Sequence, residues 1–534
     1  MTLHASARSG TSLWAVATLG VLAVASSGCS GEPSSALAKP AEGGIRYIAP
    51  EGNGVHGRYS HVQDAFLQWP LPAGAEGYAD IDGRRALQYV VEQAEISRRY
   101  RDQGHPKYWG RIIGSSADAE SAEWLATKFK DLGMSDVRIQ PFDLQPTWVP
   151  KQDYEVRVSV AGDNVELTSA QPFYRSPGTP AGGLDLEAVY VGLGSEADYL
   201  GKNVAGKAVF IYTNTGLPYD PNARVRAEKG GAAAVFESWM LPGNMRFQAY
   251  PGGERSANPA TLPTFSLGGD DGFAVRDLIA SASGRPVRVK VRLDVEMVSG
   301  LETALVWGTL PGASDETIYM IAHRDGWFDA GSDNGAGVAS MLELAAHYAK
   351  LPQSERPRTM VFIGTDGHHN SGAGSGVGLN WLDEHHAELF GKTALMINNE
   401  HPAAVQTNVR ARYMNEEADN IFWANTYAAQ QWYAGGPQRP ELEQIALDAF
   451  REFGVTIYAQ PNARPPAGEL SRYSRYVPGV ATSEFLTYFQ NDMETPETVP
   501  WTGLEAMTRA YARIIDRVND LPLSALQRPE ETTP

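Results

Sequence analysis

The sequence predicts an α/β protein with a mostly parallel central sheet, flanked by helices and interrupted by an inserted β-rich domain. Two observations support this fold class. After Gly300, short apolar runs alternate with helical patterns, which is typical of βαβ units around a parallel sheet. Residues 156–300 are instead rich in glycine and proline and hold short alternating runs, which are typical of a separate module built from strands.

The α/β domain is expected to begin with two helices within residues 84–134, and the second, at 117–132, ends at Gly133 as a helix with a glycine C-cap does. A strand is expected next, at 137–142. The inserted module is expected to contain strands at 156–160, 187–191, 208–212, 232–236 and 287–295. Beyond it we expect strands at 303–309, 317–323, 359–364 and 394–399, and helices at 337–350, 376–389 and 504–518. We therefore assign residues 84–155 and 301–525 to the α/β domain and residues 156–300 to the module.

Composition bounds the class of protein. Of the 534 residues, 43% are hydrophobic and 20% are charged, so the chain can bury the cores of roughly two to four domains. The net charge of −18 argues against nucleic acid as a partner. The single cysteine, Cys29, excludes an intramolecular disulfide and a cysteine-based zinc cluster.

The N-terminus has the features of an export signal. Arg8 precedes an apolar run at 13–25, and small residues stand directly before Cys29. This pattern resembles a bacterial lipoprotein signal, although Ser26 stands where such signals usually carry leucine. We assign residues 1–29 to a signal peptide and 30–83 to a linker and N-terminal extension, and expect a lipid anchor at Cys29 on the periplasmic or extracellular face of a bacterial cell envelope. The alternatives are an ordinary secretory signal and a retained membrane anchor.

The first group of candidate metal ligands follows a predicted strand, where open α/β sheets place their sites. His323 and Asp325 leave the strand at 317–323, and Asp333 follows on a glycine-rich loop. A histidine and an aspartate at this spacing can reach one cation, and a carboxylate at the end of the loop can bridge two. Asp325 is expected to orient His323 by accepting a hydrogen bond.

Three further groups follow along the chain. His368 and His369 lie after the next predicted strand, so that one can bind metal while the other faces substrate. Glu400 and His401 follow the strand after that and offer one carboxylate and one imidazole. The last group is the segment 488–495, which begins with tyrosine and ends in Glu-Thr.

The order of these motifs resembles the co-catalytic zinc exopeptidases of the aminopeptidase and glutamate carboxypeptidase family. Segments 203–211 and 227–236 of the module resemble the protease-associated (PA) domain inserted in the carboxypeptidase and transferrin-receptor branch of that family. The resemblance runs from about Arg84 to about Val518. It implies a zinc exopeptidase fold with an inserted PA domain, and a homodimer paired through the C-terminal helical region is compatible with it.

Carried over residue by residue, the resemblance implies one metal site made by His323, Asp333 and Glu400, with Asp333 bridging to a second ion held by His369 and Gln490. The chain departs from the family at three places. A pair of histidines replaces two glutamates, of which the first is the general base and the second a ligand. Glu400 replaces an aspartate, and Gln490 replaces a histidine.

These departures change the charge balance of the site. Asp333 and Glu400 can neutralise one dication, whereas the family's three ligand carboxylates partly neutralise two. We therefore predict one zinc ion and an eroded second site. His368 is expected to act as the base in place of glutamate, because an imidazole is suited to proton transfer at neutral pH. If His369 instead joins His323, Asp333 and Glu400 around one ion, the site is closed and structural.

Three hypotheses remain open at this point. The first is an exported metal-dependent hydrolase that cleaves a peptide, amide or ester bond with metal-activated water, in which His368 and Asp325 have the catalytic roles. The second is a binding or scaffolding protein that has kept the fold without turnover. The third is a mononuclear metalloenzyme of another reaction class. The candidates for pairing with a substrate carboxylate are Arg410, Arg412, Arg472 and Arg475.

Overall fold

The computed structural model describes residues 58–61, 70–213, 222–239, 243–249, 260–369, 376–404, 406–409, 420–424, 428–429, 431–435, 439–457, 461–465, 468–483 and 488–526. The chain divides into two compact units, Met1–Tyr47 and Ile48–Pro534, and all of the described residues lie in the second. The predicted signal peptide and its Cys29 lie outside them, as do Arg410 and Arg412. Within the described residues, no helix is long and apolar enough to cross a membrane.

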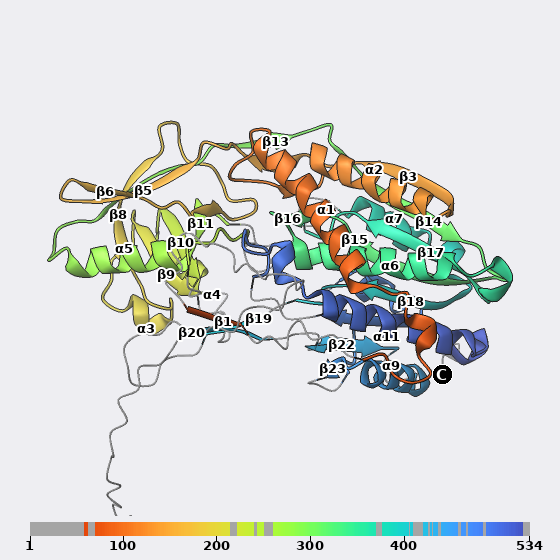
Figure 1. The fold of residues 1–534 in the computed structure, drawn as a ribbon. Coiled ribbons are helices and arrows are strands. Elements are labelled where there is room, and N and C mark those ends of the chain that lie inside the picture. The colour runs from red at the N-terminus through yellow and green to blue at the C-terminus, as the bar shows by residue number, and fades with distance from the viewer. Residues whose placement is uncertain are drawn as a thin grey trace, which may run out of the picture. The chain divides into compact units, whose positions relative to one another are not determined.

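A seven-stranded sheet forms the centre of the α/β domain (Figure 1). Its strands, in spatial order, are β22 (Gln431–Ala434), β24 (Gly479–Ser483), β18 (Thr393–Asn399), β15 (Ser314–His323), β17 (Arg358–Thr365), β14 (Glu302–Leu310) and β3 (Ser135–Asp143). The four strands from β24 to β17 are parallel to one another. The outer pairs, β22 with β24, β17 with β14, and β14 with β3, are antiparallel.

The predicted mostly parallel sheet is thus confirmed at its centre, and its outer strands are antiparallel to their neighbours. A short connection between β14 and β15 explains one edge. β14 ends at Leu310 and β15 begins at Ser314, so the chain reverses over a few residues. Because β15 is parallel to β17, this reversal leaves β14 antiparallel to β17, its neighbour in the sheet.

Helices cover both faces of the sheet. Along β15, Ile318 and Met320 belong to one apolar core, and Tyr319 and Ile321 belong to the other, as the alternation of side chains along a strand requires. The first core is closed by α6 (Gly337–Ala349), α9 (Pro440–Glu452) and α11 (Trp501–Asn519), and α1 (Gly83–Asp102) packs on α6 and α11 (Figure 1). The second is closed by α7 (Val377–Glu384), α8 (His386–Phe390) and α10 (Leu470–Tyr473). The single helix predicted at 376–389 is thus two helices that meet at His385.

The inserted module contains its own eight-stranded sheet and its own apolar core. In spatial order its strands are β6 (Asp163–Glu166), β5 (Glu155–Val160), β12 (Arg288–Arg292), β8 (Leu184–Tyr190), β9 (Ala208–Thr213), β10 (Ala234–Trp239), β11 (Thr264–Leu267) and β7 (Gln171–Pro172). Its helices are α3 (Glu196–Tyr199), α4 (Asn222–Lys229) and α5 (Gly269–Ser281). The strand predicted at 287–295 ends early, because after β12 the chain changes partner and β13 (Val295–Val298) pairs with β4 (Thr147–Pro150).

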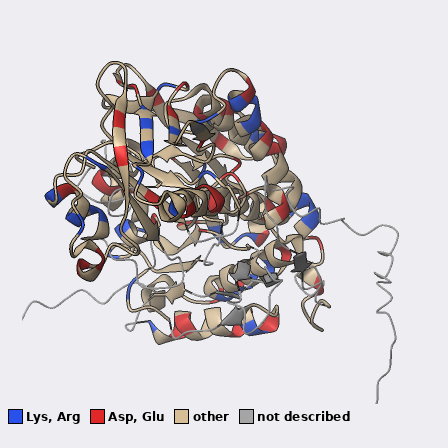
Figure 2. Cartoon of the chain, turned by 90° about the vertical axis from the view of Figure 1, so that its left-hand side faces the viewer, with Lys and Arg blue, Asp and Glu red and all other residues tan. Residues whose placement is uncertain are grey.

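Smaller elements complete the described part of the chain. The remaining helices are α2 (Ser116–Asp131), α12 (Leu523–Leu526) and the short turns Glu76–Tyr78, Gly331–Ala336, Gln353–Glu355 and Pro496–Thr498. The remaining strands are β1 (Arg58–His61), β2 (Gly110–Arg111), β16 (Gly326–Trp327), β19 (Gln406–Val409), β20 (Asn420–Ala424), β21 (Ala428–Ala429) and β23 (Thr456–Ile457). Among the described residues, acidic and basic side chains are interspersed along the outer elements (Figure 2).

One backbone contact joins the module to the segment that carries Gln490. The amide of Gln248 donates to the carbonyl of Gln490 over 2.9 Å, and Phe247 forms an antiparallel bridge with Asn491. The amide of Arg246 donates to the carboxylate of Asp492 over 2.9 Å. Three consecutive module residues therefore pair with three consecutive residues of the α/β domain.

Candidate metal centre

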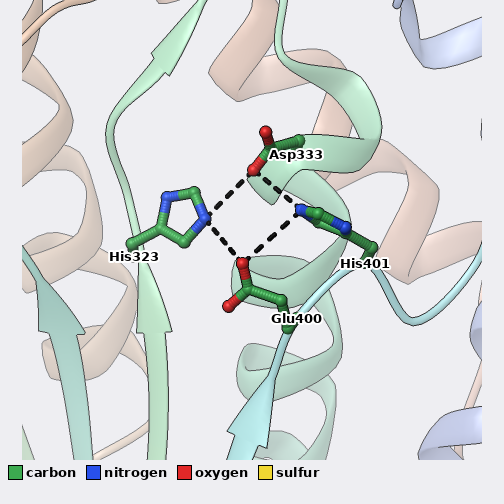
Figure 3. A group of neighbouring side chains, drawn as sticks. All are labelled: His323, Asp333, Glu400 and His401. Carbon is green, nitrogen blue, oxygen red and sulfur yellow. Dashed lines mark ion pairs between the residues drawn. The ribbon is translucent and has the colours of Figure 1, made fainter. Parts of the chain in front are cut away.

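Four side chains converge at the carboxyl end of the parallel strands (Figure 3). His323 is the last residue of β15, and Glu400 and His401 directly follow β18. Asp333 lies in the turn Gly331–Ala336, which leads into α6. Because parallel strands end at the same edge of a sheet, these residues meet although they are far apart in sequence.

Four separations within this four-residue cluster are close to those between the ligands of a metal site. His323 Nε2 lies 3.1 Å from Asp333 Oδ1 and 3.3 Å from Glu400 Oε1. His401 Nε2 lies 2.9 Å from the same oxygen of Asp333 and 3.5 Å from that of Glu400. In a tetrahedral zinc site with bonds of about 2.0 Å, neighbouring ligand atoms lie about 3.3 Å apart. The four atoms thus surround a position that suits one such ion.

The cluster is buried and its polar atoms lack ordinary partners. His323, Asp333, Glu400 and His401 are 0%, 1%, 2% and 7% exposed. Among the described residues, no hydrogen bond is made by His323 Nε2, by either carboxylate oxygen of Asp333 or by His401 Nε2. Buried polar atoms without hydrogen bonds are costly, and one cation in the cluster would satisfy His323 Nε2, Asp333 Oδ1 and His401 Nε2 together.

The electrostatics also favour a cation at this position. Burial by itself lowers the pKa of His323, but the facing carboxylates of Glu400, Asp325 and Asp333 raise it well above its usual value. The pKa of Asp333 is held well below its usual range, because the imidazoles of His369 and His401 outweigh its burial. The paired carboxylates therefore attract positive charge, which a metal ion would supply.

Local contacts fix the turn and the strand end against each other. The side chain of Asn334 donates to the carbonyl of Asn399 over 2.8 Å and accepts from the amide of His401 over 3.3 Å. A side chain at Gly337 would collide with both partners, since its Cβ would lie 2.1 Å from the Asn334 oxygen and from the Asn399 carbonyl. Glycine at this position allows the turn that holds Asp333 to approach β18 closely.

Asp325 lies behind His323 and joins two loops. Its Oδ1 is 3.4 Å from His323 Nδ1, and its backbone carbonyl is 3.1 Å from the same nitrogen. Its carboxylate also accepts from the backbone amides of His368, over 3.4 Å, and His369, over 3.0 Å. Asp325 thus faces the ring nitrogen of His323 that points away from the cluster, and it holds the following loop in place.

His368, His369 and Gln490 lie beside the cluster but do not form a matching second one. His369 Nε2 is 3.4 Å from Asp333 Oδ2, the carboxylate oxygen that faces away from His323. Gln490 lies on the other side of the His369 ring, where its Nε2 is 3.2 Å from Nδ1. His368 Nε2 is 3.8 Å from Glu400 Oε1, and its ring stacks on that of His323 with 4.2 Å between centroids.

Comparison with known proteins agrees with this arrangement. Residues 306–462 match the model of peptidase family M28. This segment carries His323, Asp333, Glu400 and His401. No curated protein matches the chain.

Solved structures show the same fold. A zinc aminopeptidase from Bacillus subtilis is 15% identical, with a TM-score of 0.58 over 85% of this chain and 97% of that one. A peptidase M28 precursor from Shewanella amazonensis is 17% identical, with a TM-score of 0.61 over 84% and 97%. An aminopeptidase from Aneurinibacillus sp. strain AM-1 is 16% identical, with a TM-score of 0.52 over 84% and 96%. The resemblance to aminopeptidase-like zinc metallopeptidases is thus confirmed by the M28 segment and by the fold, whereas the PA-domain assignment stays a prediction.

Sequence analysis of the M28 segment missed His401 as a member of the cluster. In an extended chain, the neighbouring side chains of Glu400 and His401 would point to opposite sides, so the sequence did not predict that both face the cluster. The backbone of His401 has a φ of 39°, so the chain turns sharply there and Glu400 and His401 face the same point.

Of two further acids at the site, the sequence did not indicate Glu469, and it placed Glu494 in the segment 488–495 without a role. Glu469 precedes α10 and lies 3.1 Å from His368 Nδ1. Burial alone would raise its pKa, but the neighbouring His368 lowers it to about 2. Glu494 accepts from the amides of Ser332 over 3.0 Å and Asp333 over 2.5 Å with one oxygen, and from that of Gln490 over 2.8 Å with the other. Glu494 thereby ties together the two loops that hold Asp333 and Gln490.

The arginines proposed for substrate binding are engaged elsewhere or lie outside the described residues. Arg472 donates to the side chain of Asn380 over 2.6 Å, and Arg475 pairs with Asp383 over 2.8 Å. Both partners belong to α7. The positions of Arg410 and Arg412 are not among those described.

Proposed function

We propose that this chain is a metal-dependent hydrolase of the M28 peptidase type, which holds one zinc ion and cleaves a peptide, amide or ester bond. The observation that carries the proposal is the cluster of His323, Asp333, Glu400 and His401, in which four separations between ligand atoms, 2.9–3.5 Å, are close to those of a tetrahedral zinc site. Its two carboxylates balance the charge of one Zn²⁺. The family match and the zinc aminopeptidases of similar fold support the same assignment.

His368 supplies the base in this proposal. Its Nε2 faces the cluster, 3.8 Å from Glu400 Oε1. A water oxygen attacks the substrate carbonyl carbon, His368 accepts the water proton at Nε2, and the proton passes to the leaving group as the scissile bond breaks. A bound zinc ion would lower the pKa of water and polarise the carbonyl. Asp325 supports this arrangement by facing His323 Nδ1 and accepting the amide of His368.

A second candidate function is favoured by one observation, the presence of four ligating side chains. Catalytic zinc sites have three protein ligands and an open position, whereas four protein ligands close a tetrahedral site. If His323, Asp333, Glu400 and His401 all bind the ion together, the chain is a binding or scaffolding protein with a structural metal. The hydrolase requires that one of the four withdraws or that the ion becomes five-coordinate.

The number and kind of ions follow from the same contacts. Among the described groups that bind metal well and lie beyond the four-residue cluster, the imidazole of His369 is the one that lies close to Asp333 Oδ2, at 3.4 Å. Gln490 contacts His369 Nδ1 rather than the position between His369 and Asp333. We therefore propose one ion. Iron or manganese in place of zinc would indicate the third hypothesis, a metalloenzyme of another reaction class.

Export, anchoring and assembly complete the proposal. The pattern of residues 1–29 supports an exported protein with a lipid on Cys29 in a bacterial cell envelope. The module is proposed to be a PA-like domain, supported by segments 203–211 and 227–236, which contribute to β9, α4 and β10. A homodimer is proposed on the family resemblance alone.

Elemental analysis of the purified protein tests the metal proposal. We expect about one zinc per chain in the wild type and in His369→Ala, and loss of that zinc in His323→Ala and His401→Ala. His105→Ala, which removes an imidazole outside the site, serves as the matched control. No bound metal in the wild type would overturn the proposal, and two ions per chain would overturn the single-ion assignment.

Turnover is tested separately, on a panel of aminoacyl p-nitroanilides and p-nitrophenyl esters. Hydrolysis by the wild type that is absent from an identically purified His323→Ala variant supports the hydrolase, because a contaminating enzyme would be active in both preparations. Retained zinc without hydrolysis across the panel supports the binding protein.

A further inference from the structure

We infer that Glu469 is a positioning residue that orients His368 toward the metal centre, so that an imidazole and a carboxylate together replace a single glutamate base. The inference rests on the proposed function, in which His368 is the base. It assigns a role to a residue from a segment that lies outside the M28 match at residues 306–462.

The contact between the two side chains is specific to one ring nitrogen. Glu469 Oε1 lies 3.1 Å from His368 Nδ1, and the opposite nitrogen, Nε2, faces Glu400. The Glu469 side chain is fully buried and that of His368 is 8% exposed. Water therefore competes little for Nδ1, and the carboxylate is the acceptor that faces it.

Glu469 reaches this position because the backbone before it, at Gly468, passes close to the side chains of Asn398 and Glu400. Gly468 has a φ of 133°, and a Cβ on it would lie 2.5 Å from Asn398 Nδ2 and 3.0 Å from Glu400 Oε2. The chain can pass against Glu400 at this distance only because residue 468 is glycine. The carbonyls of Gly468 and Glu469 then accept from Ser471 and from the amide of Arg472, which begin the short helix α10.

This contact has a direct chemical consequence. A carboxylate at Nδ1 keeps the proton on that nitrogen and leaves the lone pair of Nε2 directed at the substrate side. It also stabilises the positive charge that the ring acquires when it accepts a proton. A glutamate base needs no such partner, because both of its oxygens accept protons. A histidine in the same place does need one, since its two nitrogens are not equivalent.

The competing assignment makes Glu469 a metal ligand. His368, Glu400 and Glu469 have ligand atoms within 4.8 Å of one another. However, Glu400 already directs Oε1 to His323 and His401, and its Oε2 accepts from Asn398 over 3.0 Å. The nitrogen of His368 that faces Glu469 is Nδ1, whereas the one that faces Glu400 is Nε2. One ion cannot bind both nitrogens of a single ring, so the geometry favours the positioning role.

The experiment compares the full-length wild type with Glu469→Gln, His368→Asn and the exposed control Glu441→Gln. Three quantities are measured on each protein: zinc per chain by elemental analysis, kcat and KM on the best substrate of the panel above, and the downfield proton NMR signals of hydrogen-bonded imidazole N–H groups. In Glu469→Gln we expect kcat to fall about 100-fold, as for loss of a general base, with KM and zinc content unchanged. One imidazole signal should disappear or shift in both Glu469→Gln and His368→Asn and stay in Glu441→Gln.

Each contrary outcome has its own meaning. Loss of zinc in Glu469→Gln would overturn the inference and make Glu469 a ligand. An unchanged kcat, or an imidazole signal that is lost in His368→Asn but unaffected in Glu469→Gln, would also overturn it. If the wild type binds zinc but hydrolyses nothing, the proposed hydrolase fails, and the NMR signal with the zinc content still decides whether Glu469 orients His368.

Discussion

The two oxygens of Asp333 face unequal halves of the site. Oδ1 meets two imidazoles, and the carboxylate of Glu400 completes a four-residue cluster with separations of 2.9–3.5 Å. Oδ2 meets only His369, at 3.4 Å, and beyond that ring lies the amide of Gln490. Among the described residues, the first half brings two imidazoles and two carboxylates around one position, whereas the second half places the imidazole of His369 against Asp333 Oδ2. This difference between the two oxygens of Asp333 is the structural basis of the proposal that the site holds one ion, on the Oδ1 side.

The largest expected effect comes from removing a ligand on the Oδ1 side. His323→Ala should abolish metal binding and lower turnover by about 1,000-fold or more, because an activated water depends on the ion. His369→Ala, on the Oδ2 side, should keep the ion. Metal content and kcat are measured on both variants. Equal loss of metal in the two would contradict the assignment of the ion to the Oδ1 side.

A stability effect is expected at Asp366, which begins the loop that carries His368 and His369. Burial raises the pKa of Asp366 from 3.8 to about 7, and its Oδ1 has no hydrogen-bond partner among the described residues. The folded protein therefore binds this proton more tightly than the unfolded chain does. Stability falls as pH rises from about 4 to about 7, because folding then requires either a buried charge or a bound proton.

Asp366→Asn should remove that dependence. We expect the variant to be more stable than the wild type by about 3 kcal/mol at pH 8, from a pKa shift of about three units with some loss of hydrogen bonding, and equal to it near pH 4. Urea unfolding at several pH values measures the difference. Asp143→Asn, at an exposed position, is the control and should follow the wild type at each pH. A constant difference across the pH range would contradict the prediction.

A smaller effect is expected at Glu494, which accepts the amides of Asp333 and Gln490. Glu494→Gln places an amide NH₂ group against backbone N–H donors, so the turn that holds Asp333 should loosen. Metal affinity should fall about 10- to 100-fold, as is common when a residue that holds a ligand is changed. Competition with a chelator gives the affinity. If the metal affinity of Glu494→Gln equals that of the wild type, Glu494 is needed only to hold the loop of Gln490.

The smallest effect is expected far from Asp333. Arg475 pairs with Asp383 over 2.8 Å, and its side chain is 60% exposed. Exposed ion pairs contribute about 0–1 kcal/mol, so Arg475→Ala should leave the stability nearly unchanged. Activity should stay within about twofold, because the guanidinium is engaged by α7. A large rise in KM would show instead that Arg475 contacts the substrate.

Much of the fold and of the candidate site could be predicted from the sequence, because the candidate ligands His323 and Glu400 stand at or directly after the ends of strands. Buried strands are recognisable from their apolar runs, and parallel topology brings their ends together. The sequence could not predict His401, since its direction depends on a φ of 39° at one residue. Glu469 was out of reach for another reason. It lies between short elements with no strong periodicity, and only the folded chain brings it to His368.

The bridge between Phe247 and Asn491 bears on how such a chain can change over evolution. Residues 246–248 of the module hold residues 490–492, and Glu494 then extends the connection to the turn of Asp333. A recombination event that exchanged the module for an unrelated one would also remove the partner of this segment. The module and the α/β domain are therefore expected to be inherited as one piece, and a transplanted module needs a segment that can pair as residues 246–248 do.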